Sequence, residues 1–313
     1  MGAHYLGQAI VHALVAALVV ELLIRAWKVE EPAFRQRLRL LIVATPLFAL
    51  PLLELWPVRR EEWFEERWAL LSDRHWAELT IFGVATGSLF LGALAALGLA
   101  FFLADLVPFL RHRLLRRPQQ THGADAGFAD EVARLSQILG VPAPRLRVLE
   151  REQPALLCRG VRAPELVISR GALLLLDPAE LKAALAHELS HLKAQDPLWS
   201  WLLMAARALQ AFNPVVQVAV RAVARDAERR ADDAACAGES RLALASAVVK
   251  LHRSMDQGGR SGLAGWFKRA QERTIEDRCR RLLDAETPVP AQLAPVRLCL
   301  AAASLGVMLF FVV

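Results

Sequence analysis

The stretch Ala186-His187-Glu188-Leu189-Ser190-His191 carries the pattern H-E-x-x-H and lies in a run, Asp177–Asp196, with the pattern of one amphipathic helix. Residues four apart share one face of a helix, so the imidazoles of His187 and His191 can bind the same zinc ion. Glu188 follows the first histidine and can take a proton from a zinc-bound water. The pattern therefore predicts a helix that presents two metal ligands and a base.

A catalytic zinc ion needs a third protein ligand, since its remaining position is left for chemistry. The segment Arg225-Asp226-Ala227-Glu228-Arg229-Arg230-Ala231-Asp232 offers one, because enough chain follows His191 for a helical hairpin to return Glu228 to the metal. Asp232 comes one helical turn later and can accept the free N–H of a ligating imidazole. Taken alone, this segment is equally compatible with a charged surface helix. After an H-E-x-x-H, we expect one zinc ion per chain, bound by His187, His191 and Glu228.

Apolar residues make up 55% of the 313 residues, and they are clustered. Leu79–Ala104 contains no charged residue and is long enough to cross a hydrocarbon core of about 30 Å. The other uncharged runs are Tyr5–Val20, Leu40–Leu53 and Leu298–Val313, of which the second also fits a buried soluble helix. We therefore expect about four transmembrane helices, three in an N-terminal membrane domain (1–110) and one at the C-terminus (291–313).

The distribution of basic residues predicts how these helices are oriented. A basic cluster at 111–117 follows the third run, whereas no Lys or Arg precedes the first run. This asymmetry predicts an outer N-terminus and a cytoplasmic central region, in a bacterial inner (plasma) membrane. Arginines that flank the membrane explain much of the formal net charge of +6, which favours anionic lipid headgroups as partners and argues against nucleic acid. The four cysteines form no C-x-x-C pair and fit reduced thiols.

The region that carries the metal motif (128–290) follows a polar linker (111–127). Local patterns predict a helix at Phe128–Leu139 that stops at Gly140, strands at Arg145–Leu149 and Leu166–Ser169, and a strand or loop at Pro154–Gly160. Asp177-Pro178 fits the start of the H-E-x-x-H helix. The apolar stretch 198–220 is interrupted at Asn213-Pro214, which favours two helices over a fifth transmembrane span.

These motifs resemble the integral-membrane gluzincin metallopeptidases. The HtpX heat-shock proteases and the CAAX prenyl endopeptidases share H-E-x-x-H followed by the form Arg225-x-x-Glu228-x-x-Ala231-Asp232. Asp196, Phe212-Asn213-Pro214 and Arg278–Leu283 are similar to the β-lactam sensor-transducer (antirepressor) peptidases. The resemblance covers residues 128–313. It implies a mainly α membrane protein with a zincin-like α+β peptidase domain, built on a small sheet and the H-E-x-x-H helix.

By this resemblance the ligands are His187, His191 and Glu228, with Glu188 as the base. The implied function is a zinc endopeptidase that hydrolyses peptide bonds of protein substrates at the cytoplasmic face. The strand Leu166–Ser169 would lie along the cleft, where a substrate peptide adds to a sheet edge, or would be a core strand without a substrate role. Asp196 either orients the helix or caps the segment that follows.

Other functions stay open at this point. A signal-transducing antirepressor-type peptidase would act on one repressor or on itself, with a regulatory membrane partner supplying the stimulus. An inactive peptidase scaffold is less consistent with the intact ligand set. An intramembrane protease would place H-E-x-x-H in an apolar helix, whereas Glu180, Lys182 and Lys193 flank this one. The sequence does not reveal the substrate, the oligomeric state or the group that stabilises the oxyanion.

Overall fold

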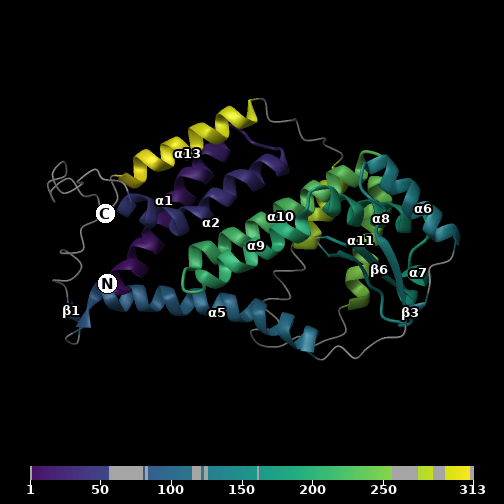
Figure 1. The fold of residues 1–313 in the computed structure, drawn as a ribbon, viewed down its shortest axis with the longest axis horizontal. Coiled ribbons are helices and arrows are strands. Elements are labelled where there is room, and N and C mark those ends of the chain that lie inside the picture. Colours follow the sequence, from purple (N-terminus) through teal and green to yellow (C-terminus); the bar gives the residue numbers. More distant parts are fainter. Residues whose placement is uncertain are drawn as a thin grey trace. The chain divides into compact units, whose positions relative to one another are not determined.

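The structure is a computed structural model that describes residues 2–55, 80–81, 84–114, 121–122, 126–160, 162–255, 274–284 and 293–310. The chain divides into two compact units. The first comprises residues 1–116, 202–226 and 289–313, and the second comprises residues 117–201 and 227–288. Figure 1 labels their helices and strands.

Most described residues of the first unit are helical. Its elements are α1 (Gly2–Ala26), α2 (Pro32–Leu55), the short strands β1 (Thr80–Ile81) and β2 (Val84–Ala85), α5 (Thr86–Leu114), α13 (Ala294–Phe310), much of α9 (Asp196–Leu209) and the first part of α10 (Pro214–Cys236). Figure 1 shows α1, α2 and α13 side by side, and the main core of the unit lies among these helices and α10.

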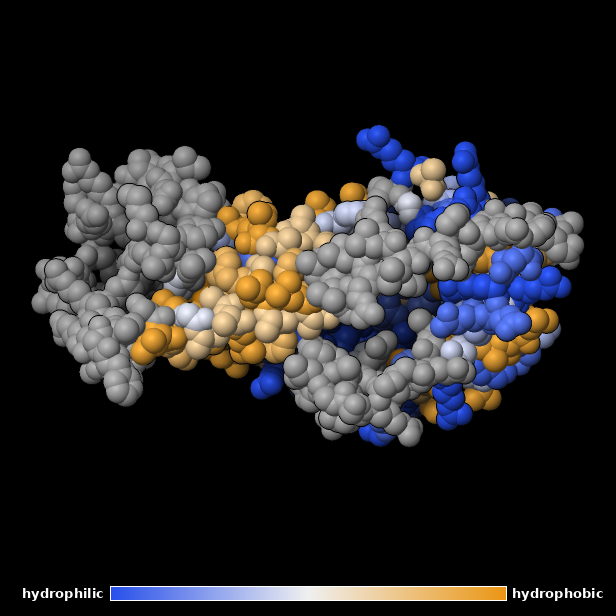
Figure 2. Space-filling model, turned by 90° about the horizontal axis from the view of Figure 1, so that it is seen from below, coloured by the Kyte–Doolittle hydropathy of each residue, from blue (hydrophilic) through white to orange (hydrophobic). Residues whose placement is uncertain are grey.

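The two faces of α1 differ in a way that suits a lipid environment. The buried face carries small or β-branched residues at helical spacing: Ala9, Ala13, Ala16, Val20 and Ile24. The opposite face exposes Leu14, Leu18 and Leu22, which are 49–64% accessible. Small residues allow close helix packing, and large apolar residues on the outside are stable when lipid surrounds them. Figure 2 shows hydrophobic residues over much of the described surface of this unit.

The predicted count of four transmembrane helices is not confirmed. Among the described residues, one helical segment, Gly7–Ala26, is long and apolar enough to cross a membrane. The apolar helical segments Leu89–Ala104 and Ala294–Leu309 are shorter. Within the predicted run 79–104, the short strands β1 and β2 precede α5, which begins at Thr86.

The predicted break between α9 and α10 is confirmed, and Asn213 explains it. Its Oδ1 accepts hydrogen bonds from the backbone N–H groups of Val215 (3.2 Å) and Val216 (3.4 Å), which caps α10. Its Nδ2 donates to the carbonyl of Ala9 at 3.1 Å. Buried Asn213 therefore ends one helix, starts the next and ties α10 to α1.

The second unit contains a four-stranded sheet in the order β3-β4-β6-β5. The strands are β3 (Thr121–His122), β4 (Arg145–Leu149), β5 (Leu156–Arg159) and β6 (Glu165–Ser169). β4 and β6 are parallel, whereas β5 is antiparallel to β6, with Cys158 opposite Leu166. The helices of this unit are α6 (Ala126–Leu139), α7 (Arg170–Leu175), α8 (Pro178–Lys193), α11 (Arg241–Met255) and the last part of α10, and residues 274–283 are also helical. A mainly α protein with a small sheet in this unit is therefore confirmed.

The helix α8 packs on this sheet through leucines. Leu185 and Leu189 of α8 are fully buried with Leu166 of β6 and with Val132 and Leu135 of α6. These leucines repeat at the four-residue spacing of one helix face, so the opposite side of α8 is left for the histidines. The core therefore fixes the rotation of α8 that the metal motif needs.

Of the two roles expected for Leu166–Ser169, the sheet edge is wrong, because β6 lies between β4 and β5 and pairs with both. Within the predicted linker 111–127, α5 continues to Leu114, β3 pairs with β4 and α6 begins at Ala126. The domain ranges 1–110, 128–290 and 291–313 stay predictions. Residues 202–226, however, pack with the first unit although they fall within the predicted range 128–290.

Candidate metal centre

Local sequence starts α8 at the residue that the pattern predicts. The Oδ1 of Asp177 accepts a hydrogen bond from the backbone N–H of Glu180 at 2.8 Å, and Glu180 Oε2 accepts one from the N–H of Asp177 at 2.9 Å. This reciprocal capping box satisfies two backbone donors that helix geometry leaves unpaired. Glu180 also accepts from Lys250 of α11 at 2.6 Å and from Ser246, so the start of α8 is tied to α11.

Small residues bring α8 close to α10 within the second unit. Ala183 and Ala186 of α8 are buried together with Ala235 of α10. The Oγ of Ser190 donates to the carbonyl of His187 at 2.7 Å and lies 3.3 Å from the carbonyl oxygen of Ala231. Alanine at these positions lets the two backbones approach, which places side chains from both helices in one site.

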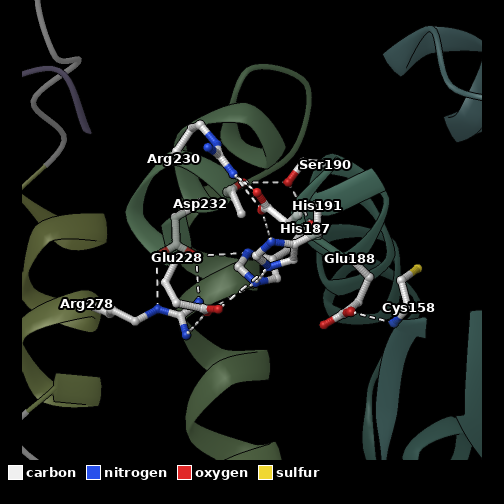
Figure 3. Close-up of polar contacts among 11 residues, drawn as sticks. Cys158, His187, Glu188, Ser190, His191, Glu228, Arg230, Asp232 and Arg278 are labelled. Carbon is white, nitrogen blue, oxygen red and sulfur yellow. Dashed lines mark hydrogen bonds and ion pairs between the residues drawn. The ribbon is translucent and has the colours of Figure 1, made fainter. Parts of the chain in front are cut away.

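The three predicted ligands converge. Figure 3 shows the imidazoles of His187 and His191 and the carboxylate of Glu228 directed toward one another. The Nε2 atoms of the two histidines are 3.3 Å apart. Glu228 Oε2 lies 3.6 Å from Nε2 of His187, and Oε1 lies 3.7 Å from Nε2 of His191. One ligand atom from each residue can therefore be chosen so that all three lie within 4.8 Å of one another.

These spacings fit a zinc ion. Zinc binds imidazole nitrogen and carboxylate oxygen at about 2.0–2.2 Å in a tetrahedron, which puts neighbouring ligand atoms about 3.3–3.6 Å apart. The two Nε2 atoms are 3.3 Å apart, and each lies 3.6–3.7 Å from a different carboxylate oxygen of Glu228, which is close to that range. Three protein ligands leave the fourth corner of the tetrahedron for chemistry.

A carboxylate lies behind each imidazole. Nδ1 of His187 is 3.0 Å from Oδ1 of Asp232, and Nδ1 of His191 is 2.7 Å from Oδ2 of Asp196. A proton held on each Nδ1 leaves the Nε2 lone pairs facing each other, an arrangement that a cation stabilises. The structure therefore brings Asp232 to the position that the sequence predicts. It also places Asp196 against His191, whereas the sequence pattern left the role of Asp196 open.

Two arginines hold these carboxylates, and the sequence pattern does not reveal either pairing. Arg278 contacts Asp232 through Nε (3.0 Å) and Nη2 (2.7 Å), and its Nη1 lies 2.8 Å from Glu228 Oε2. Arg230 donates to both carboxylate oxygens of Asp196. The only signal in the sequence is the basic run Arg278–Leu283, and it points to no particular partner.

The charges of this cluster are strongly coupled. Burial lowers the pKa of His187, but the carboxylates of Asp232 and Glu228 outweigh burial and raise this pKa to about 9. Burial raises the pKa of Glu228, whereas His187 and Arg278 outweigh it and lower this pKa to about 2. A metal ion must displace the proton from Nε2 of His187, so metal binding at neutral pH releases a proton.

Glu188 lies on a different side of α8 from the two histidines and contacts the sheet. Its Oε2 accepts a hydrogen bond from the backbone N–H of Cys158 on β5 at 2.9 Å. Figure 3 shows the carboxylate of Glu188 turned toward Cys158, away from Glu228. The residue predicted as the base therefore lies between the imidazole pair and the sheet.

The Cys158 contact identifies the outer edge of β5 beside Glu188, where Glu188 binds the N–H of Cys158. Ser169 donates to the carbonyl of Ala155, so the backbone polar groups of Ala155 face β6. Directions alternate along a strand, so those of Leu157 also face β6, while those of Leu156 and Cys158 face away from it. Among the described strands β5 is the sheet edge next to the candidate metal centre, in place of Leu166–Ser169.

Comparison with known proteins covers this site. The family described as BlaR1 peptidase M56 matches residues 145–280, a range that includes every residue of the candidate centre. A protease HtpX homolog of Pelotomaculum thermopropionicum is 37% identical over 95 residues, which are 29% of this chain and 34% of that protein. A protease HtpX homolog of Acidiphilium cryptum is 32% identical over 124 residues, 39% of this chain and 42% of that protein.

A third relative matches this chain over a longer stretch. A protease HtpX homolog of Ralstonia nicotianae is 29% identical over 198 residues, which are 52% of this chain and 68% of that protein. Of the two relatives named before it, from Pelotomaculum thermopropionicum and Acidiphilium cryptum, this chain spans less than half the length. The resemblance stated from the motifs is confirmed: this chain is similar to proteases of the HtpX type and to the BlaR1 peptidase M56 family.

Proposed function

We propose that this chain is a membrane-anchored zinc endopeptidase that hydrolyses peptide bonds of protein substrates at the cytoplasmic face of a bacterial inner membrane. One observation carries the proposal: one ligand atom from each of His187, His191 and Glu228 lies within 4.8 Å of the other two, with a carboxylate behind each imidazole. The similarity to proteases named HtpX homologs and the family match to residues 145–280, which include these residues, support it.

In this proposal His187, His191 and Glu228 hold one zinc ion per chain. A bound zinc ion supplies a Lewis acid that polarises the scissile carbonyl and lowers the pKa of water toward about 7. Asp232 and Asp196 keep the Nδ1 protons of the two imidazoles, so that Nε2 stays available as a ligand. These ligands only hold the metal ion, and another residue carries out the proton transfers.

Glu188 is the general base of the proposed reaction. It takes a proton from the attacking water and passes it to the leaving amine. The hydrogen bond from Cys158 to Oε2 holds the carboxylate beside β5, and Oε1 is left to receive the proton. A substrate strand that lies along the outer edge of β5 would pass beside this carboxylate.

The helical first unit provides the membrane anchor. Its α1 exposes leucines and buries alanines, and α5 and α13 also expose large apolar side chains. The cytoplasmic orientation rests on the basic cluster at 111–117 against an N-terminus without Lys or Arg. The proposal includes about four transmembrane helices, three within residues 1–110 and one within residues 291–313.

Glu188→Gln tests the proposed function, because glutamine keeps the side-chain shape and cannot take the proton. The full chain, purified in detergent and loaded with zinc, is incubated with β-casein, an extended protein probe, and new peptide termini are identified by mass spectrometry. We expect Glu188→Gln to keep one zinc ion per chain and to lose cleavage, while the control Glu152→Gln cleaves like the parent. If Glu188→Gln cleaves at the parent rate, the base assignment is wrong.

A second candidate function is a signalling peptidase of the antirepressor type, which cleaves one repressor or itself, with a regulatory membrane partner. The match of the BlaR1 peptidase M56 family to residues 145–280 favours it. Comparison of the membrane proteomes of cells that hold the parent or Glu188→Gln separates the two functions. Many Glu188-dependent cleavages indicate quality control, and cleavage confined to one regulator or to this chain indicates signalling.

A further inference from the structure

A cavity of about 320 Å³ lies in the second unit at the end of β5. The residues that form most of its wall are Pro142, Pro164, Leu192, Gln195, Pro197 and Leu198. Gly160, which directly follows β5, and Arg162 complete it. None of the residues assigned above to the metal or to the proton transfer lines this cavity.

The cavity is adjacent to the candidate metal centre along two elements. Leu192 follows Glu188 by one helical turn, so the two residues share a face of α8. Gly160, directly after β5, comes two residues after Cys158, whose N–H binds Glu188. Gln195 and Pro197 flank Asp196, which contacts His191 at 2.7 Å. A peptide along β5 that passes Glu188 would therefore reach the cavity within one or two residues.

The lining defines the kind of group that fits. Three prolines and two leucines make the walls mostly apolar, and Arg162 is the only charged residue among the described residues that line the cavity. A volume of about 320 Å³ accommodates one large side chain. An apolar side chain gains by leaving water there, whereas a lysine or arginine side chain would meet the positive charge of Arg162.

Strand direction decides which side of the scissile bond the cavity serves. Antiparallel pairing is the more stable arrangement per residue, so we take the substrate to run opposite to β5. Its amino-terminal part then lies beside Gly160, past the carboxyl end of β5, and its carboxyl-terminal part lies beside Leu156. The cavity would accordingly receive a residue on the amino-terminal side of the bond that is cleaved beside Glu188.

We propose that this cavity is a specificity subsite that takes a large apolar side chain (leucine, phenylalanine or methionine) on the amino-terminal side of the scissile bond, and disfavours lysine and arginine there. The inference rests on the proposed peptidase function. Leu198→Trp tests it by filling the cavity from its exposed rim, and Arg162→Glu tests the exclusion of basic residues. Leu174→Trp is the matched control, since Leu174 of α7 is 81% exposed and does not line the cavity.

The first measurement is a cleavage profile. The detergent-solubilised full chain is incubated with peptides from a digested proteome, and the cleavage sites are read by mass spectrometry. We expect large apolar residues to be enriched at one position before the cleaved bond. Leu198→Trp should reduce their preference over alanine roughly tenfold, Arg162→Glu should raise acceptance of lysine and arginine, and Leu174→Trp should leave the profile unchanged.

The second measurement does not need turnover. Two fluorescein-labelled peptides of one cleaved sequence, with phenylalanine or alanine at that position, are titrated onto the Glu188→Gln protein and onto Glu188→Gln/Leu198→Trp. We expect Glu188→Gln to bind the phenylalanine peptide about tenfold more tightly, and Leu198→Trp to remove that difference.

The results separate this inference from the proposed function. Absence of any Glu188-dependent cleavage by the parent contradicts the peptidase itself. Glu188-dependent cleavage whose preference is the same in Leu198→Trp and Leu174→Trp overturns the subsite alone. Enrichment confined to the carboxyl-terminal side of the bond also overturns it. If Leu198→Trp fails to fold, Arg162→Glu still decides, because an unchanged rejection of basic residues contradicts the assigned cavity.

Discussion

Replacement of Asp196 by asparagine distinguishes a residue that supports metal binding from one that only supports the fold. Oδ2 of Asp196 lies 2.7 Å from Nδ1 of His191, and Arg230 holds the other side of the carboxylate. Asparagine keeps the size of the side chain and can still accept one hydrogen bond. It removes the negative charge that makes the imidazole a stronger ligand. The substitution therefore tests charge and leaves shape nearly unchanged.

The magnitude follows from similar carboxylate–histidine–zinc arrangements. Loss of such a partner costs about 10–100-fold in metal affinity, which is about 1.4–2.7 kcal/mol. Both effects of Asp196→Asn, a less basic imidazole and one negative charge fewer near a cation, act in the same direction. The expected result is therefore weaker zinc binding, with a smaller change in the stability of the zinc-free protein.

The assay is a competition between the full chain in detergent and a chromophoric zinc chelator. Asp196→Glu restores the charge and should recover part of the affinity, whereas Arg230→Gln removes only the outer contact and should have a smaller effect. Thermal unfolding of the zinc-free proteins controls for folding. A zinc affinity of Asp196→Asn within twofold of the parent, together with a lowered unfolding temperature, would refute the metal role and leave Asp196 as a structural residue.

Two further predictions concern pH. Burial raises the pKa of Glu180, but Lys250 and Ser246 outweigh burial and lower this pKa below its ordinary 4.5. The charged Glu180 therefore stabilises the folded protein above pH 4.5, and this stabilisation is lost as pH falls through the lowered pKa of the folded state. Glu180→Gln should therefore cost about 1.5–3 kcal/mol at pH 7, seen as a lower unfolding temperature, and a gap that stays constant down to pH 3 would contradict this. The pKa of His187 is raised to about 9, so protons compete with zinc below that pH, and the apparent zinc affinity should fall up to roughly tenfold per pH unit as pH drops. Competition with a zinc chelator between pH 7 and 9 measures this affinity. A zinc affinity that does not change over this pH range would be inconsistent with a protonated His187.

The helix α8, which carries H-E-x-x-H, could be predicted because its information is local. The spacing of His187 and His191 puts two imidazoles on one face, and Asp177 and Glu180 provide the capping box that starts the helix. Glu228 could be predicted as a ligand from a local pattern too, because Glu228 and Asp232 lie one turn apart on a helix. The structure brings these residues together, and their roles stay proposals.

The remaining contacts depend on tertiary packing, which no local pattern encodes. Arg278 reaches Asp232 from a distant helix, and one of several neighbouring arginines cannot be singled out from sequence. The edge position of β5 follows from the order of strands in the sheet, and strand order is not readable from the strands themselves. The count of four membrane helices stays a prediction, because uncharged length alone does not reveal where a helix begins.

The central claim is that α8 and α10 supply three ligands to one metal ion. The most direct test is the zinc content of the purified full chain, measured by mass spectrometry of the metal, together with zinc X-ray absorption to identify the ligand atoms. We predict one zinc ion per chain with nitrogen and oxygen ligands at about 2.0–2.2 Å, and loss of that ion in Glu228→Ala as well as in His191→Ala. A Glu228→Ala protein that retains one zinc ion with unchanged affinity would contradict the account.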